Sequence, residues 1–258
     1  MTTKELIYSQ LKQMGLKHTD TVMIHSSLKA INLSADELIE SLTSYFNKGL
    51  VILPTHSWKQ MSETYNMFNS QTEPSCTGVL SEIFRKHPKA IRSLHPTHSV
   101  AAIGHRAKEF LKNEENANTP TPYEGVYGKL SDINTYILLV GVTSIRNTFI
   151  HAIEEKFDIP NRLTPSPIKF RIYNPINNEI IEREFYKHYT PDYPHLSENF
   201  LKIEQQLINL NIIKKTKFGH ASTLIMNAKE LDCQISKWLK QDPTLFSDNK
   251  PFSYHIKD

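Results

Sequence analysis

The feature that most constrains the fold is the segment from Tyr136 to Glu155, in which an apolar run leads through a short polar turn into a helix-like pattern. Ile137 to Val142 has the aliphatic content of a buried strand. Beyond the turn, His151 and Glu154 are three residues apart and share one face of the predicted helix. In open α/β sheets ligands bind beyond the carboxyl ends of strands, where this turn should lie. The segment therefore indicates a site at the sheet edge with the residues of general base catalysis.

Helix-like and strand-like patterns alternate through residues 1–160, which favours an α/β sheet covered by helices on both faces. Ser34 to Glu37 has the pattern of a capping box and predicts the start of one of these helices. The expected strands cover residues 21–25, 50–54, 99–103 and 137–142, and the expected helices lie near 6–14, 34–45, 79–84 and 148–155.

From about residue 161 the pattern changes. Residues 168–173 and 179–185 resemble the two strands of a hairpin around a turn rich in Asn and Pro. A long amphipathic helix is expected over 196–210, and Asn227 and Glu230 should cap a last helix. No repeat or linker divides the chain, so we expect one domain over residues 1–258. The polar segment 61–76 is expected to be a loop, either a lid over a site or a plain surface excursion.

Composition limits the class of partner. The net charge of +3 is too small to indicate nucleic acid binding. No stretch of about 18 apolar residues predicts a membrane span, and the first residues lack a secretory signal, so no membrane partner is expected. Cys76 and Cys233 are isolated, which is typical of reduced thiols in a cytoplasmic protein.

Two further segments carry polar residues beside predicted strands. His25 to Ala30 follows a strand, so its backbone N–H groups and serines could meet a ligand, with Lys29 available to a phosphate. A turn stabilised by its own serines is the alternative. Arg92 to Ser99 contains an arginine and two histidines ahead of another strand. No spacing typical of a metal site appears, so no metal is expected, and nothing near Cys76 would lower the pKa of its thiol.

The spacing of His151 and Glu154 predicts a separate role for each residue in proton transfer. In the first turn of a helix the macrodipole disfavours a positive charge, so the imidazole of His151 should be neutral and able to accept a proton. Glu154 could then hold the other ring nitrogen and stabilise the imidazolium. An ion pair on the helix surface is the alternative explanation.

Together these segments resemble one enzyme family. The pattern Thr148-x-x-His151-x-x-Glu154 after an aliphatic strand is similar to the signature of the aminoglycoside 3-N-acetyltransferase family. Four further segments follow the family's order: 15–28, 51–55, 78–85 and 92–99. Tyr127 to Leu130 also fits, and the resemblance covers about residues 3–155.

The resemblance implies a three-layer αβα sandwich around a mixed central sheet, distinct from the GNAT acetyltransferases, and acetyl-CoA as cosubstrate. It implies His151 as general base, Glu154 as its orienting carboxylate, and Thr148 or backbone N–H groups as donors to the oxyanion. Residues 1–160 would bind the cofactor and carry catalysis, and 161–258 would complete the acceptor site. The residues it implies on the cofactor side are His25, Ser26, Ser27, Leu28, Lys29, Arg92, Thr97 and Ser99.

The acetyl acceptor is less constrained. An aminoglycoside is polycationic and needs a site lined by carboxylates, but the candidate acids are scattered and Arg146 stands in the turn before the helix. A biosynthetic or nucleotide-linked amino sugar, or even a hydroxyl acceptor, stays open beside an antibiotic.

A CoA- or sugar-binding module without turnover and a metal-dependent hydrolase are further alternatives. A homodimer could form through helix 196–210, with packing inside one chain as the alternative. The scattered carboxylates considered above for an aminoglycoside site are Glu63, Glu73, Glu124, Asp158 and Asp192.

Overall fold

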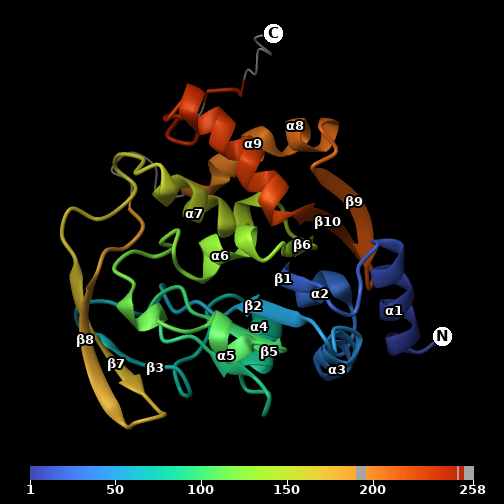
Figure 1. Ribbon diagram of the computed structural model, residues 1–258, viewed down its shortest axis with the longest axis horizontal. Helices are drawn as coiled ribbons and strands as arrows, with labels where there is room; N and C mark the ends of the chain where they lie inside the picture. The colour runs from blue at the N-terminus through green and yellow to red at the C-terminus, as the bar shows by residue number, and fades with distance from the viewer. Residues whose placement is uncertain (190–195, 249, 253–258) are drawn as a thin grey trace.

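A seven-stranded sheet forms the centre of the molecule (Figure 1), in a computed structural model that describes residues 1–189, 196–248 and 250–252. Its strand order is β4-β5-β2-β1-β6-β10-β9. Strand β1 pairs in parallel with both β2 and β6, whereas β5 and β10 run antiparallel to their neighbours. The sheet is therefore mixed, as expected. Its strands are β1 (Thr21–Ser26), β2 (Leu50–Pro54), β4 (Ile91–Arg92), β5 (Val100–Gly104), β6 (Tyr136–Val140), β9 (Ile213–Phe218) and β10 (Ala221–Asn227).

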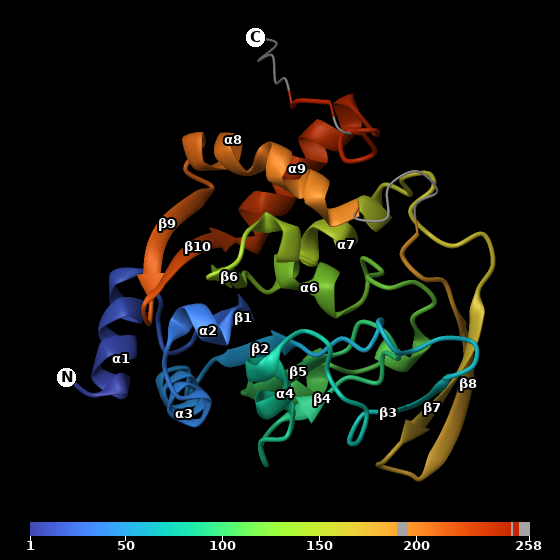
Figure 2. The same ribbon diagram turned by 180° about the vertical axis from the view of Figure 1, so that it is seen from behind.

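Helices cover both faces of this sheet (Figures 1 and 2). Because side chains alternate along a strand, Val22 and Ile24 face one layer, whereas Met23 faces the other. The first layer contains α1 (Thr3–Gln13), α2 (Leu28–Ile31), α3 (Ala35–Tyr45) and α4 (Val79–Arg85). The second contains α5 (Ala107–Phe110), α6 (Val126–Asp132), α7 (Phe149–Lys156), α8 (Glu204–Asn209) and α9 (Ala228–Gln241). The predicted three-layer αβα sandwich is confirmed.

A second, three-stranded sheet lies at the side of the molecule (Figure 2). The predicted hairpin is present as β7 (Ile168–Asn174) and β8 (Glu179–Phe185). Strand β3 (Met67–Asn69) adds to it in parallel with β7. Because β3 lies inside the segment 61–76, and Met61 and Phe68 are fully buried, this segment is a packed part of the fold rather than a plain surface loop.

Several local expectations were wrong. The helix expected over 196–210 is a 3-10 helix (Leu196–Ile203) followed by the short α8, and its apolar residues Phe200 and Leu207 pack into the core of the same chain. Strands β9 and β10 were not anticipated. Ser34 does precede α3, but its side chain makes no capping hydrogen bond, so the capping box does not form. Two more 3-10 turns cover Glu114–Asn116 and Ser144–Arg146.

The parallel strands bring their carboxyl ends to one edge of the sheet. His25 lies at the end of β1, and the segments that leave β2 and β6 at this edge contain His56 and Thr148. Gly141, directly after β6, has φ +65°, and a Cβ at this position would lie 2.5 Å from the Cβ of Ala30. The glycine therefore allows β6 to end tightly against α2. Within the described residues, no helix combines the length and the apolar character needed to cross a bilayer.

Candidate active site

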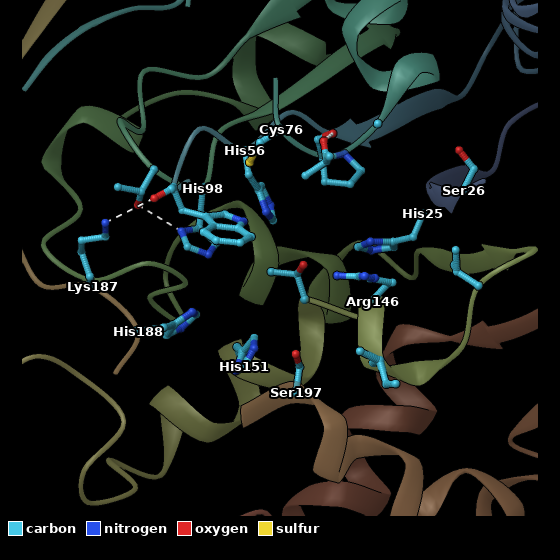
Figure 3. Close-up of a pocket in the computed structure, with 18 residues that line it drawn as sticks. His25, Ser26, His56, Cys76, His98, Arg146, His151, Lys187, His188 and Ser197 are labelled. Atoms are coloured by element: carbon cyan, nitrogen blue, oxygen red, sulfur yellow. Dashed lines mark hydrogen bonds between the residues drawn. The ribbon is translucent and has the colours of Figure 1, made fainter. Parts of the chain in front are cut away.

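A cavity of about 560 Å³ opens at this edge of the sheet (Figure 3). The part of the chain up to α7 supplies the end of β1, the segments after β2 and β6 and the start of α7, and the part after β8 supplies Lys187, His188 and Ser197. The site therefore lies where ligands bind in open α/β sheets. Five of the described lining residues are histidines: His25, His56, His98, His151 and His188.

His151 and Glu154 form a hydrogen-bonded pair. The helix α7 begins at Phe149, as its pattern predicted, and the Nδ1 atom of His151 lies 2.9 Å from Oε2 of Glu154. The side chain of Glu154 is only 2% exposed, so the pair is not the surface ion pair considered as the alternative. Since Nδ1 is occupied by the carboxylate, Nε2 of His151 remains as the nitrogen available to a ligand in the cavity.

Arg162 completes this pair from the loop after α7. Its Nη2 lies 2.8 Å from the other oxygen of Glu154, and its side chain is 6% exposed. The geometry is that of a close ion pair rather than of a well-aligned hydrogen bond. The arginine therefore compensates the buried carboxylate without competing for the oxygen that faces His151.

Burial controls the protonation of the pair. It lowers the pKa of His151 well below the ordinary value, and the charges of His188 and Arg162 act in the same direction. Burial also raises the pKa of Glu154 to about 7, with Arg162 opposing the shift. The imidazole is therefore neutral at physiological pH, but mainly because it is desolvated, whereas the sequence had suggested the helix dipole as the cause.

Three further imidazoles extend from His151 along the cavity wall. The ring centroids of His151 and His188 are 4.2 Å apart, those of His188 and His98 are 4.9 Å apart, and those of His98 and His56 are 4.5 Å apart. Burial lowers the pKa values of His56 and His98 well below the ordinary value. The described residues contain no group of three His, Cys, Asp or Glu arranged to hold a metal.

Thr148 lies at the cavity as expected, but its hydroxyl already has a partner. It hydrogen-bonds to the buried Tyr127, whose hydroxyl lies 2.5 Å from Nε2 of His56. Since burial keeps His56 neutral, the tyrosine can donate to it and accept from Thr148. A donor role of Thr148 toward an oxyanion would require this contact to break.

The residues expected on the cofactor side separate into two groups. His25, Ser26 and Thr97 line the cavity, and the ring of His25 points into it (Figure 3). Nε2 of His25 is buried without a hydrogen-bond partner, and burial lowers the pKa of this ring to about 3.

The other five residues are not in the described cavity lining. Ser27 caps α2, Leu28 packs against the core and Lys29 is exposed. Arg92 and Ser99 lie in a buried polar network. Nε of Arg92 donates to Oγ of Ser99 at 3.0 Å, and its Nη2 donates to the carbonyl of Thr55 at 2.6 Å. Both side chains are therefore engaged within the protein, and their assignment to the cofactor side stays a prediction.

The described cavity lining contains cations but no carboxylate. Arg146 and Lys187 both line the cavity. The candidate acids lie elsewhere: Glu63, Glu124 and Asp158 are exposed, Glu73 is buried and lines a neighbouring pocket, and Asp192 lies outside the described residues. Burial raises the pKa of the Cys76 thiol, which also lines the cavity, so this cysteine is a poor nucleophile.

Sequence reasoning did not identify Arg162, His188 or Glu155. His188 follows β8, and its Nε2 lies 3.2 Å from Oε1 of Glu155 on α7. The only available signal was the double acid Glu154-Glu155, which places carboxylates on two adjacent faces of one helix.

A buried histidine paired with a carboxylate faces a cavity at the edge of a mixed αβα sheet, an arrangement with the groups that acid–base chemistry needs. The family model described as aminoglycoside 3-N-acetyltransferase matches residues 23–240. The chain belongs to this family and is an aminoglycoside N(3)-acetyltransferase-like acyltransferase.

Curated relatives support this assignment. The chain is 29% identical over 176 residues to the SPbeta prophage-derived aminoglycoside N(3')-acetyltransferase-like protein YokD of Bacillus subtilis (strain 168), a match that covers 59% of this chain and 64% of that relative. It is 23% identical over 248 residues to aminoglycoside N(3)-acetyltransferase IV of Salmonella sp, with 94% and 89% covered.

Solved structures share the fold. The AAC(3)-IVa apoenzyme superposes with a TM-score of 0.77 at 22% identity, covering 94% of this chain and 90% of that one. AAC-IIIb, solved as a binary complex with CoASH, gives a TM-score of 0.80 at 19% identity, with 93% and 97% covered. The expected α/β architecture is therefore that of this family.

Proposed function

We propose that this protein transfers the acetyl group of acetyl-CoA to an amine, with His151 as the general base. The observation that carries the proposal is the 2.9 Å contact between Nδ1 of His151 and the buried carboxylate of Glu154 at the wall of the cavity. A neutral imidazole held in this way can accept a proton at Nε2, and Glu154 then stabilises the imidazolium.

The proposed reaction is direct transfer within a ternary complex. The amine attacks the thioester carbonyl while His151 takes a proton from its nitrogen. Donors about 3 Å from the developing oxyanion would lower the barrier further, with backbone N–H groups or the hydroxyl of Thr148 as candidates. A covalent acyl-enzyme is not required, and the raised pKa of Cys76 argues against a thiolate that would form one.

The cofactor is assigned to the side of the cavity formed by the carboxyl end of β1. His25 and Ser26 line this side, and Arg146 lies near His25 (Figure 3), whereas Thr97 lines the cavity beside His98. Arg146 is exposed and has no carboxylate partner among the described residues, so its guanidinium is free to meet an anion. A relative solved with CoASH supports CoA as the ligand. Residues 161–258 would complete the acceptor side through Lys187, His188 and Ser197.

Two acceptor classes are supported by different observations. The names of the relatives favour an aminoglycoside, and one solved relative is AAC-VIa bound to sisomicin. The described cavity lining, however, offers Arg146 and Lys187 and no carboxylate. A polycation would be repelled by such a lining, whereas an amino sugar that carries a phosphate would be attracted.

A thiol-release assay separates these acceptors. We expect glucosamine 6-phosphate or a nucleotide-linked amino sugar to give a kcat/KM about tenfold or more above that of gentamicin at low salt, because of the charge of the lining. The difference should shrink at high salt, where charges are screened. Faster transfer to gentamicin would instead favour the aminoglycoside. Binding of acetyl-CoA without thiol release from any amine would favour a binding module.

The substitution Arg162→Gln should move the acid limb of the pH–rate profile to higher pH by about one unit. The positive charge of Arg162 lowers the pKa values of both His151 and Glu154. Without it both values rise, so a higher pH is needed to obtain the neutral imidazole and the ionised carboxylate. The measurement is kcat against pH for the wild type, Arg162→Gln and Arg162→Lys, which keeps the charge. An acid limb of Arg162→Gln at the same pH as that of the wild type would contradict this electrostatic role.

A further inference from the structure

The cavity contains a second histidine–carboxylate pair that the proposed reaction does not use. His188, from the segment after β8, contacts Glu155, the residue that follows Glu154 on α7. Nε2 of His188 lies 3.2 Å from Oε1 of Glu155. If Nε2 donates to this carboxylate, Nδ1 remains as the basic nitrogen of His188.

Glu155 is held as a carboxylate. Its side chain is 8% exposed, and burial alone would raise its pKa. Hydrogen bonds from His188, Thr119 and Thr121 outweigh burial and lower the pKa below the ordinary value. The hydroxyl and backbone N–H of Thr121 donate to Oε1 at 2.7 and 2.9 Å, and the hydroxyl of Thr119 donates to Oε2 at 2.5 Å. A negatively charged carboxylate therefore lies behind His188.

The two histidines face the same space. Their ring centroids are 4.2 Å apart, and both side chains line the cavity (Figure 3). The side chain of His188 is 18% exposed and that of His151 is 13% exposed, so both can reach a bound ligand. At this separation two imidazolium ions would repel each other strongly. The two rings are therefore suited to carrying protons one after the other.

N-acetylation needs two such transfers. At neutral pH an alkyl amine is an ammonium ion, and its nitrogen must lose one proton to attack and a second to become an amide. The proposed function assigns His151 to only one of these protons. A second base beside the same nitrogen can accept the other and so raise the fraction of amine that is ready to attack.

We propose that His188, supported by Glu155, accepts the first proton from the ammonium form of the acceptor and so makes a second catalytic base in this site. This inference rests on the proposed acetyl transfer. His188 takes a proton from the ammonium and releases it to solvent. The amine lone pair then forms the C–N bond, the carbonyl electrons move to oxygen, and His151 takes the second proton. When the carbonyl re-forms, the C–S bond breaks toward sulfur, and the thiolate takes the proton from His151 to give CoASH.

The charged and titratable neighbours of His188 come from several elements. His98 and His151 lie on its two sides, and Glu155 lies behind it. His56, His95 and Glu154 also interact with it electrostatically, and Lys187 precedes it in the chain. With this many titratable neighbours, the pH profile is compared between variants rather than interpreted from the wild type alone.

The test compares an amine that is protonated at pH 7 with one that is not. Thiol release is measured with glucosamine 6-phosphate or sisomicin as the ammonium acceptor, and with hydroxylamine as the neutral acceptor. With the ammonium acceptor at pH 7, His188→Gln should lower kcat/KM about a hundredfold. The loss should shrink as the pH passes the pKa of the acceptor amine, and it should be at least tenfold smaller with hydroxylamine. Glu155→Gln, which keeps the hydrogen bond but removes the charge, should show the same pattern with a smaller loss.

Three outcomes are distinguished. His151→Gln should lower thiol release with both acceptors. His105 is an exposed histidine away from the cavity, so His105→Gln serves as the matched control. Equal losses with both acceptors and at all pH values in His188→Gln would overturn the second base and leave the proposed function intact. Absence of thiol release from every amine in the wild type would overturn both. Acetyl-CoA binding by calorimetry verifies that each variant is folded.

Discussion

The substitution His151→Ala is expected to lower kcat by about two to four orders of magnitude. The imidazole is the group that takes the proton from the attacking nitrogen, and Glu154 cannot replace it because this carboxylate is buried behind the ring, with its side chain 2% exposed. The measurement is steady-state thiol release at pH 7.5 with the acceptor that gives the highest kcat/KM in the thiol-release assay. Because the base acts in the transition state, kcat should fall while KM changes little.

The control is chosen to separate chemistry from packing. His151→Gln retains most of the side-chain volume, which matters because the ring packs edge-on against Phe200 with centroids 4.7 Å apart. Both variants should bind acetyl-CoA. Near-normal turnover in either one would remove His151 from the mechanism. A large fall in the alanine variant with little effect in the glutamine variant would indicate a packing role instead.

The parts of the fold that the sequence predicted are those set by local pattern. The parallel strands β1, β2 and β6 are aliphatic runs buried on both faces, and such runs can be identified without knowledge of their neighbours. The contact of His151 with Glu154 was predictable for the same reason, because three residues along a helix bring two side chains together. The catalytic roles of these residues stay a prediction until the variants are measured.

The features that could not be predicted from the sequence depend on contacts between segments that are far apart along the chain. The contact between His188 and Glu155 joins residues 33 positions apart, and Arg162 meets Glu154 from a loop without regular structure. Strand β9 carries Lys214, Lys215 and Lys217 and so lacks an apolar alternation, which is typical of an edge strand. Burial of the carboxylates likewise follows from packing, so the pKa shifts of the site could not be predicted.

Arg92 shows why a cationic residue beside a strand is an ambiguous signal. The sequence placed it on the cofactor side, but the structure surrounds its guanidinium with protein acceptors from three segments. These are the hydroxyl and carbonyl of Thr55, the hydroxyl of Ser99, and the carbonyls of Ser70 and Glu73. The guanidinium also lies over the ring of Phe68, with Cζ 5.1 Å from its centroid. Arg92 therefore joins the carbonyls of Ser70 and Glu73 to the end of β2.

The substitution Arg92→Leu should consequently lower the free energy of unfolding by about 3–5 kcal/mol, because several buried acceptors lose a charged donor at once. Urea denaturation followed by fluorescence or circular dichroism measures the change. Arg92→Lys should recover only part of it, since an ammonium group cannot reproduce the planar, multidentate geometry of the guanidinium.

A cofactor role would give the opposite pattern. If Arg92 held a phosphate of CoA, its loss would weaken acetyl-CoA binding several-fold and leave the stability of the free protein nearly unchanged. Lys29→Leu provides the matched comparison, because Lys29 is exposed and makes no ion pair among the described residues. We expect Lys29→Leu to leave the urea midpoint within error of the wild type, since its side chain holds no buried group. A stable Arg92→Leu variant with impaired CoA binding would support the sequence-based assignment and show that the buried network tolerates the loss of its central donor.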